Sequence, residues 1–463
     1  MSAPIIVWFR QDLRLSDQPA LAAAAAEGPV LPVYVLDDET PGQWAIGGAQ
    51  RWWLHGSLHS LARDLSAIGA PLLLRRGRSV EVLTQLAEEV GARRVHALHH
   101  YEPWWRKAEA EVGQRLHLVL HHGNQLAPPE SIRTGGGGYR IYSPYSRALF
   151  EKLPPAEPTT APSRLAGVPN VPSERLDDWA LRPTRPNWAA AFPERWTPGE
   201  TAALQLVEQF AGQVEGYVER RNLPSQTGTS SLSPHLHFGE ISPATVWHRL
   251  ASQAADKFLK ELAWRDFAQH VMLNQPKIGE HHGKPRFARF PYRTGDAAEA
   301  DFRAYKQGRT GYPIVDAGLR ELWTTGWMHN RVRMIAASFL TKHLLIDWRR
   351  GATWFWDTLV DADYGNNSLN WQWVAGTGVD ASPFNRIMAP LLQSEKFGAA
   401  DYIRRWVPEL AHLSDADIHD PHGRGVAPAA YPQPLIGHRE GRARALAALR
   451  QMGNRSEGAR ELS

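Results

Sequence analysis

Two groups of side chains at helical spacing have the chemistry to bind a polar ligand that carries an aromatic plane. The first group is Glu261, Trp264 and Arg265, and the second is Asn330, Arg333 and Met334. Within each group the spacing is i, i+3, i+4, which places the three side chains on one helix face. An acid, an indole, an amide and a guanidinium on two such faces can line a pocket. An ion pair with core packing explains the spacing equally well.

Seven of the 19 tryptophans lie between residues 323 and 373, where carboxylates and amides are also frequent. The polar neighbours of Trp348, Trp371 and Trp373 are Asp361, Asp363, Asn366, Asn367 and Asn370. A single tryptophan is more often part of a core than of a site. The cluster as a whole favours a polar ligand with an aromatic plane.

Two segments suit phosphate groups. One is the loop Gly228-Thr229-Ser230-Ser231-Leu232-Ser233-Pro234. Backbone N–H groups at a helix start and the neighbouring hydroxyls suit an anion such as pyrophosphate, although a capped helix without a ligand is the commoner case. The other is residues 320–350, which carry six basic and two acidic side chains, a net charge of +4. Basic residues among aromatics suit a phosphodiester backbone, and the alternative is a solvated helix face.

Four apolar runs alternate with helix-like stretches near the N-terminus, which predicts a parallel sheet of the α/β type. The runs are residues 5–9, 30–36, 71–74 and 95–98, and the helix-like stretches are 18–27, 50–68 and 80–90. Charged residues follow the first two runs, namely Arg10, Asp12, Arg14, Asp37 and Asp38. Ligands of open α/β sheets bind beyond such strand ends. Neither a dinucleotide fingerprint nor a phosphate-binding loop motif occurs.

Ten prolines make continuous secondary structure unlikely over residues 151–200, which we interpret as a connector. From about residue 200 the pattern is helical, as in the series Val332, Ile335, Ala336, Phe339, Leu340 and Leu344. Ser233-Pro234 and Ser242-Pro243 each predict an N-cap followed by proline in the first helical turn. The predicted organisation is an α/β domain over 1–130, a connector over 131–200 and a helical domain over 201–463.

The 463 residues are 43% hydrophobic with a net charge of +4, which is typical of a globular, weakly basic protein. Cysteine is absent, which excludes disulfides, thiolate nucleophiles and cysteine metal sites. The histidine pairs 99–100, 121–122 and 281–282 are adjacent and would not face one another on a helix, so we predict no metal site. No stretch suits a membrane span and no secretory signal is visible, so we expect a cytoplasmic protein.

Several long motifs occur in order along nearly the whole chain. They include Val7-Trp-Phe-Arg-Gln-Asp-Leu-Arg-Leu-Ser-Asp17, Gly311-Tyr-Pro-Ile-Val-Asp-Ala317, Thr325-Gly-Trp-Met-His-Asn-Arg331, Asn370-Trp-Gln-Trp373 and Ser394-Glu-Lys-Phe397. Together they resemble the photolyase/cryptochrome family, specifically the class I cyclobutane pyrimidine dimer photolyases. The resemblance implies an N-terminal Rossmann-like α/β antenna domain, a long connector and a C-terminal all-helical domain that binds FAD and DNA.

The resemblance also implies which residues hold FAD. Tyr217 and the loop Thr229, Ser230, Ser231, Leu232 and Ser233 would hold the phosphates and ribose. The rest of the site would be lined by Phe258, Glu261, Arg265, Asn330, Arg333, Asp361, Asp363 and Asn367. Arg333 would pair with Asp361 beside the isoalloxazine, and Asn367 would face flavin N5. An amide there can hydrogen-bond a reduced, anionic flavin without adding a like charge.

The implied reaction is repair of cyclobutane pyrimidine dimers in double- or single-stranded DNA. Light excites FADH⁻, an electron passes to the flipped-out dimer, the ring splits and the electron returns; photolyases are known base-flipping enzymes. Glu261 would hydrogen-bond the dimer carbonyl, Trp264 and Trp371 would stack on its bases, Asn330 would support the site, and Met334 would pack on the lesion. Arg221, Arg331 and Arg386 would lie near DNA phosphates.

Two features depart from the family pattern. Trp371 and Trp348 match the inner positions of an electron relay, but the outer position reads Phe290-Pro-Tyr292, with tyrosine in place of tryptophan. Either the relay ends on Tyr292, with a radical sensitive to pH or isotope because the phenol proton must leave, or it uses another residue. The segment Tyr101-Glu-Pro-Trp-Trp105 lacks the folate pattern. If a second antenna chromophore is bound, Asp37 and Glu102 favour 8-hydroxydeazaflavin over folate.

Two other kinds of function fit part of the pattern. One is a cryptochrome-like blue-light receptor that binds flavin and repairs nothing. The other is a helical nucleic-acid-binding protein without a cofactor. Asn367, where plant cryptochromes have aspartate, Glu261 and the lack of a long C-terminal extension favour repair. We expect the enzyme to be a monomer.

Overall fold

The computed structural model describes residues 3–251 and 254–458, and the chain forms two compact units. The first unit comprises the described residues of Met1–Glu215, Ser230–Pro276 and Val360–Asp363. The second comprises those of Gly216–Thr229, Lys277–Leu359 and Tyr364–Ser463. The predicted boundaries at residues 130 and 200 stay a prediction. The last five residues of the predicted helical domain lie outside the described part.

A five-stranded parallel sheet forms the centre of the first unit, in the strand order β3-β2-β1-β4-β5. The strands are β1 Ile5–Phe9, β2 Val30–Leu36, β3 Leu73–Arg76, β4 Arg94–Leu98 and β5 His117–His121. The four predicted apolar runs each overlap a strand, which confirms the α/β prediction. The edge strand β5 was not predicted, because its side chains are partly exposed and its ends are histidines.

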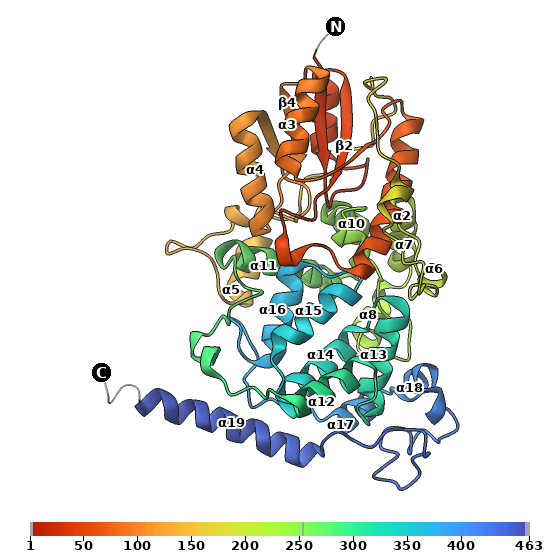
Figure 1. The fold of residues 1–463 in the computed structure, drawn as a ribbon, viewed down its shortest axis with the longest axis vertical. Coiled ribbons are helices and arrows are strands. Elements are labelled where there is room, and N and C mark those ends of the chain that lie inside the picture. Colours follow the sequence, from red (N-terminus) through yellow and green to blue (C-terminus); the bar gives the residue numbers. More distant parts are fainter. Residues whose placement is uncertain (1–2, 252–253, 459–463) are drawn as a thin grey trace. The chain divides into compact units, whose positions relative to one another are not determined.

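Helices α3 (Ser79–Val90) and α4 (Pro103–Arg115) lie beside the strands and share their core (Figure 1). Leu83 and Val112 of these helices are fully buried in one cluster with Ile6 and Val33 of the sheet. Helix α1 (Pro19–Glu27) connects β1 to β2, α2 (Gly48–Ala67) lies between β2 and β3, and α5 (Tyr142–Phe150) follows the last strand. Burial of apolar side chains between layers therefore holds this part of the unit together.

Between residues 151 and 200 the described elements are short. They are η3 Leu176–Trp179 and α6 Phe192–Arg195. The first unit continues with α7 Glu200–Ala211, α9 Ser233–His237, α10 Pro243–Leu250 and α11 Asp256–Asn274. The Ser242 hydroxyl accepts the Thr245 N–H at 2.9 Å, so the predicted cap of α10 is confirmed.

The second unit is helical throughout its described elements. They are α8 Tyr217–Arg220, α12 Asp296–Lys306, α13 Pro313–Thr325, α14 Asn330–Ser338, α15 Trp348–Thr358, α16 Tyr364–Ala375, α17 Pro390–Lys396, α18 Ala400–Trp406 and α19 His438–Gly458. Helix α14 runs on into a single π turn, η6 Phe339–His343. The whole predicted apolar series from Val332 to Leu344 is buried. Across residues 3–251 and 254–458, every helix is too short or too polar to cross a membrane.

A buried carboxylate joins α2 to α9 in the first unit. Glu240 is fully buried, and its Oε1 accepts the Trp53 indole N–H at 3.0 Å. Its Oε2 lies in hydrogen-bonding contact with His235 Nδ1. Both partners are themselves buried, so Glu240 satisfies two polar groups that water does not reach.

We expect Glu240→Ala to lower the free energy of unfolding by roughly 3 kcal/mol, because it leaves two buried donors without an acceptor. Chemical denaturation measures this change. Glu88→Ala, on the exposed side of α3, is the control and should stay within about 0.5 kcal/mol of the wild type. Equal effects of the two substitutions would contradict a stabilising role for the buried contacts.

Candidate functional site

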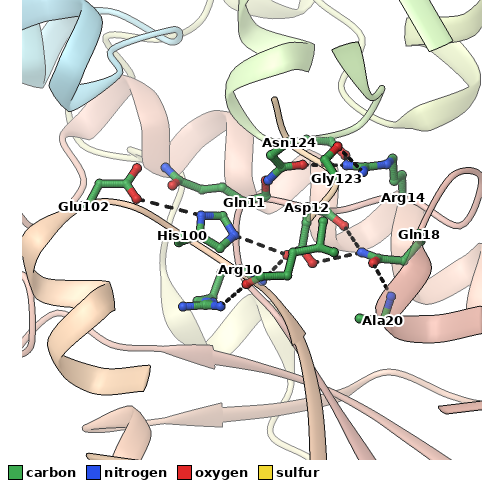
Figure 2. Close-up of polar contacts among 12 residues, drawn as sticks. Arg10, Gln11, Asp12, Arg14, Gln18, Ala20, His100, Glu102, Gly123 and Asn124 are labelled. Atoms are coloured by element: carbon green, nitrogen blue, oxygen red, sulfur yellow. Dashed lines mark hydrogen bonds and ion pairs between the residues drawn. The ribbon is translucent and has the colours of Figure 1, made fainter. Parts of the chain in front are cut away.

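The strand order of the sheet reverses between β1 and β4, which is where open α/β sheets bind ligands. Figure 2 shows the polar residues beyond these strand ends. Asp12 accepts the Arg10 backbone N–H at 2.6 Å and the Gln18 amide at 2.9 Å. Arg14 Nη1 donates to Asn124 Oδ1 at 2.9 Å. Asp12 and Arg14, which were predicted to meet a ligand here, thus bind other groups of the first unit.

Glu102, which directly precedes α4, differs from these residues in its protonation. It is buried, and its Oε2 lies 3.9 Å from His100 Nδ1 (Figure 2). Burial, followed by the nearby Asp363 carboxylate, raises the pKa of Glu102 to about 7. Burial also lowers the pKa of His100 well below its ordinary value, so the imidazole is neutral and does not offset the charge. The protonated form of the Glu102 carboxyl is therefore favoured far more than in an ordinary glutamate.

Asp37, the other residue predicted to meet a second chromophore, is bound within the first unit. Its carboxylate accepts four hydrogen bonds, from the N–H groups of Glu39, Thr40 and Ser79 and from the Thr40 hydroxyl. The bond to Ser79 is 2.7 Å and lies at the start of α3. Asp37 thus joins the turn after β2 to that helix.

The predicted face of α11 is present, and it has an aromatic neighbour that the sequence did not indicate. Glu261 and Trp264 are partly exposed on this helix, and Glu261 pairs with Lys257 at 3.2 Å. The Trp264 ring stacks on Tyr142, with centroids 3.5 Å apart and planes 6° apart. The Tyr142 hydroxyl donates to the Lys260 carbonyl at 3.0 Å, which fixes the tyrosine. One face of the indole is therefore covered.

Arg265 and Phe258, on the same helix, make contacts inside the first unit. Arg265 Nη1 donates to the Asn124 carbonyl at 2.6 Å, and its Nη2 donates to the Leu236 carbonyl at 3.2 Å. Phe258 is 5% exposed and packs on Phe210 at a centroid distance of 4.7 Å. Both residues hold α11 in place.

The hydroxyl-rich loop is only partly as predicted. Ser231 has a left-handed φ of +54° and Leu232 is right-handed, a succession that turns neighbouring N–H groups to one side. The prediction that Ser233 caps α9 is wrong, because Leu232 precedes the helix and makes no side-chain bond. Ser233 is the first helical residue, and its hydroxyl donates to Asp361 Oδ2 at 2.6 Å. The Ser233 hydroxyl therefore bonds Asp361 and does not cap the helix.

Asp363 is linked to α11 in a similar way. Its Oδ2 accepts the Gln269 amide at 2.8 Å. Asp361 and Asp363 are partly buried and belong to the first unit, although the residues on both sides of this short segment belong to the second. Tertiary contacts thus hold both acids beside the loop and α11.

In the second unit, α16 presents Asn367 and Trp371 one turn apart on one face. Asn367 Nδ2 donates to the Ala352 carbonyl at 2.9 Å. Trp371 is 3% exposed and meets Phe355 edge-on at 4.9 Å. A Cβ atom on Gly351 would lie 2.2 Å from the Trp371 ring, so the indole fits against α15 only because this residue is glycine.

The second predicted relay residue, Trp348, is fully buried at the start of α15. Trp348 lies one turn before Gly351, and the Trp371 ring packs against Gly351. Trp348 and the Trp371 ring therefore lie on the same side of α15. Its indole N–H donates to His282 Nδ1 at 3.2 Å. The Tyr292 ring lies parallel to the His282 ring, with centroids 6.4 Å apart. His282 was not predicted, because it is 66 residues from its partner.

The predicted face of α14 is also formed. Asn330 is exposed at the start of the helix, and Arg333 and Met334 are partly buried. Arg333 Nε donates to the Met328 carbonyl at 2.7 Å. Tyr217, at the start of α8 in the same unit, is 8% exposed.

Three predicted phosphate-contacting arginines form a cluster in the second unit. Burial, and then the charges of Arg221 and Arg386, lower the pKa of Arg331. Arg331 donates to Asn222 Oδ1 at 2.6 Å, and its guanidinium lies 4.5 Å from the Phe397 ring centroid. Arg386 is exposed beside the Trp373 ring at 5.9 Å. Arg221 and Arg386 are therefore each close enough to repel Arg331.

The predicted site residues are thus grouped within each unit. The first unit holds Ser230, Ser231, Leu232, Ser233, Phe258, Glu261, Trp264, Arg265, Asp361 and Asp363. The second holds Tyr217, Arg221, Thr229, Tyr292, Asn330, Arg331, Arg333, Met334, Trp348, Asn367, Trp371 and Arg386.

Comparison with known proteins matches both parts of the chain. Residues 5–163 match a family model described as DNA photolyase, and residues 258–451 match one described as the FAD binding domain of DNA photolyase. The deoxyribodipyrimidine photo-lyase of Agrobacterium fabrum is 46% identical, over 96% of this chain and 98% of its own. Cryptochrome-2 of Arabidopsis thaliana is 35% identical, over 91% of this chain and 73% of its own.

A solved structure, described as a bacterial class III photolyase from Agrobacterium tumefaciens, is 45% identical with a TM-score of 0.93. It covers 98% of both chains. The α/β and helical fold prediction is therefore confirmed, whereas the class I subtype is not supported.

We expect Gly351→Ala to displace the Trp371 ring and to lower the free energy of unfolding by about 1–3 kcal/mol, because the added methyl group overpacks this contact. Near-ultraviolet circular dichroism and denaturation measure the two effects. Gly113→Ala in α4 is the matched control, since a Cβ there meets no atom within 4 Å, and it should stabilise slightly. An unchanged aromatic spectrum in Gly351→Ala would contradict the close contact.

Proposed function

The chain belongs to the photolyase/cryptochrome family, and we propose that it is an enzyme that uses light to split cyclobutane pyrimidine dimers in DNA. The observation that carries this proposal is the α16 face with Asn367 and Trp371 one turn apart. It offers an amide and an indole together, in a segment that matches an FAD-binding family model.

FAD is the proposed cofactor, and the described residues fit its chemistry. Ser230 and Ser231 offer hydroxyls and N–H groups suited to a pyrophosphate, and the left-handed Ser231 supports that use of the loop. Asn367 offers an uncharged amide suited to a reduced flavin. When bound, reduced FAD supplies the light-excited electron. The proposed cofactor residues are those named from the family resemblance, Tyr217, Thr229 to Ser233, Phe258, Glu261, Arg265, Asn330, Arg333, Asp361, Asp363 and Asn367.

The proposed lesion contacts are the residues that the family resemblance implies. Glu261 hydrogen-bonds the dimer carbonyl, where negative charge develops. Trp264 and Trp371 stack on the flipped bases, and Asn330 and Met334 complete the contact. Tyr142 supports Trp264 from behind, because the 3.5 Å stack leaves the indole one remaining face for a base.

Trp371 and Trp348 are the proposed relay that delivers electrons for reduction of the cofactor. Their common side of α15 and the burial of both rings support this role. The outer end of the relay is either Tyr292 or another residue.

For the subtype, the class III description of the solved Agrobacterium photolyase leads us to propose class III in place of class I. A second antenna chromophore stays a proposal, with 8-hydroxydeazaflavin preferred to folate. Glu102 is the better candidate contact, because the Asp37 carboxylate already accepts four hydrogen bonds.

A cryptochrome-like receptor is the second candidate function, and the similarity to a plant cryptochrome favours it. Asn367 favours repair instead, because an aspartate at this position would place a second negative charge beside a reduced flavin.

A dimer-containing single-stranded oligonucleotide, illuminated with the chemically reduced enzyme, should lose its dimers in light and keep them in the dark. Chromatography of the oligonucleotide measures this. Glu261→Gln should lower the repair yield about tenfold or more, since transition-state hydrogen bonds are commonly worth that much. Glu88→Gln is the exposed control. Dimers that survive illumination while flavin is bound would favour the receptor.

DNA affinity should fall with salt, and Arg386→Ala should reduce the slope of log K against log salt by about one unit. The reason is that each phosphate contact releases condensed counterions. Arg93→Ala, exposed in the first unit, is the control and should leave the slope unchanged. Fluorescence anisotropy at several salt concentrations measures both. An equal slope in Arg386→Ala and wild type would remove Arg386 from the phosphate contacts.

A further inference from the structure

The hydrogen bond between Trp348 and His282 has only one possible direction. An indole nitrogen can donate and cannot accept. The 3.2 Å contact therefore requires a lone pair on His282 Nδ1, which places the imidazole proton on Nε2. A buried, redox-capable side chain is thus in direct contact with a base.

The surroundings keep that base neutral. Burial, and then the Arg349 charge, lower the pKa of His282 to about 4, while Asp347 opposes the shift and His281 adds to it. At pH 7 the imidazole therefore carries no proton on Nδ1. Its Nε2 is buried and has no hydrogen-bond partner in the described part of the chain. Among those residues, the bond to Trp348 is therefore the one hydrogen bond that the ring makes.

Loss of an electron makes the indole N–H far more acidic than it is in the intact ring, and the radical persists longer once that proton has moved. We propose that His282 Nδ1 takes the indole proton of Trp348 when Trp348 is oxidised, and that the electron relay ends there. This inference rests on the proposed function for its oxidant. It assigns His282 as the proton acceptor of the relay.

The step balances without a further reagent. Bound FAD in its oxidised form would supply the light-driven oxidant; Trp371 would give up one electron to it and regain one from Trp348. The N–H bond of Trp348 breaks and an N–H bond forms on His282, which leaves a neutral indolyl radical beside an imidazolium. Return of the electron and the proton restores both side chains.

Tyr292 is less suited to hold the radical, although the sequence offers it. Burial raises the pKa of its phenol, so oxidation must expel the proton. In the residues that the structure describes, no group accepts a hydrogen bond from the Tyr292 hydroxyl. Its ring stacks on His282 at 6.4 Å and 11°, which orients the imidazole toward Trp348.

Flash photolysis of the full-length, FAD-loaded enzyme with oxidised flavin tests the inference. In the wild type we expect a long-lived neutral tryptophanyl radical whose formation slows in D₂O. His282→Gln keeps an acceptor oxygen and removes the base, so the neutral radical should be lost and a short-lived cation radical should replace it. His282→Phe removes both and should give the same result. His281→Gln, the same change on the exposed neighbour, should match the wild type.

A neutral tryptophanyl radical that persists in His282→Gln and in His282→Phe would overturn the inference. So would a tyrosyl radical in the wild type that disappears in Tyr292→Phe. A second readout needs no light: nitrogen-15 NMR of His282 in the dark should give the Nε2–H tautomer, and the Nδ1–H tautomer would overturn the assignment. Dimer repair by the chemically reduced wild type tests the proposed function separately, because it bypasses the relay.

Discussion

A buried polar group is costly without a partner, and the buried groups that find partners organise both units of the protein. In the first unit, Asp12 meets a backbone N–H and an amide at the strand ends, and Glu240 meets the indole of Trp53. In the second unit, the Trp348 indole meets His282. Each bond ties together segments that are distant in sequence or closes the end of a strand. The residues whose side chains could bind or react are thus held in place by the same hydrogen bonds that stabilise the fold.

Local patterns were enough to predict four of the five strands and the helices α1, α2 and α3. The apolar runs 5–9 and 30–36 coincide with β1 and β2, because strands buried in a parallel sheet are almost wholly apolar. Strand β5 escaped this rule because it lies at the edge of the sheet and is partly exposed. Ser233 has a residue type that often caps helices, yet its hydroxyl donates to Asp361, which is 128 residues away. The tertiary contact thus outweighed the local capping propensity of serine.

The candidate site, too, has residues that local spacing predicted and residues that only tertiary contacts place. Helical spacing placed Glu261 beside Trp264, and the structure keeps that face. Tyr142 and His282 could not be found from spacing, because their partners are far along the chain and both residue types are common in cores. The short segment 360–363 joins the first unit although its flanking residues belong to the second, which no linear boundary can express. Electrostatic shifts such as that of Glu102 also depend on burial, which sequence gives only as a tendency.

The repulsion of Arg331 by Arg221 and Arg386 has a consequence for the evolution of this protein. Like charges held together weaken the folded state in which they meet. Replacing the exposed Arg386 by a neutral side chain would relieve part of this repulsion and would also remove a positive charge from the surface. Stability and surface charge therefore place opposite demands on this position.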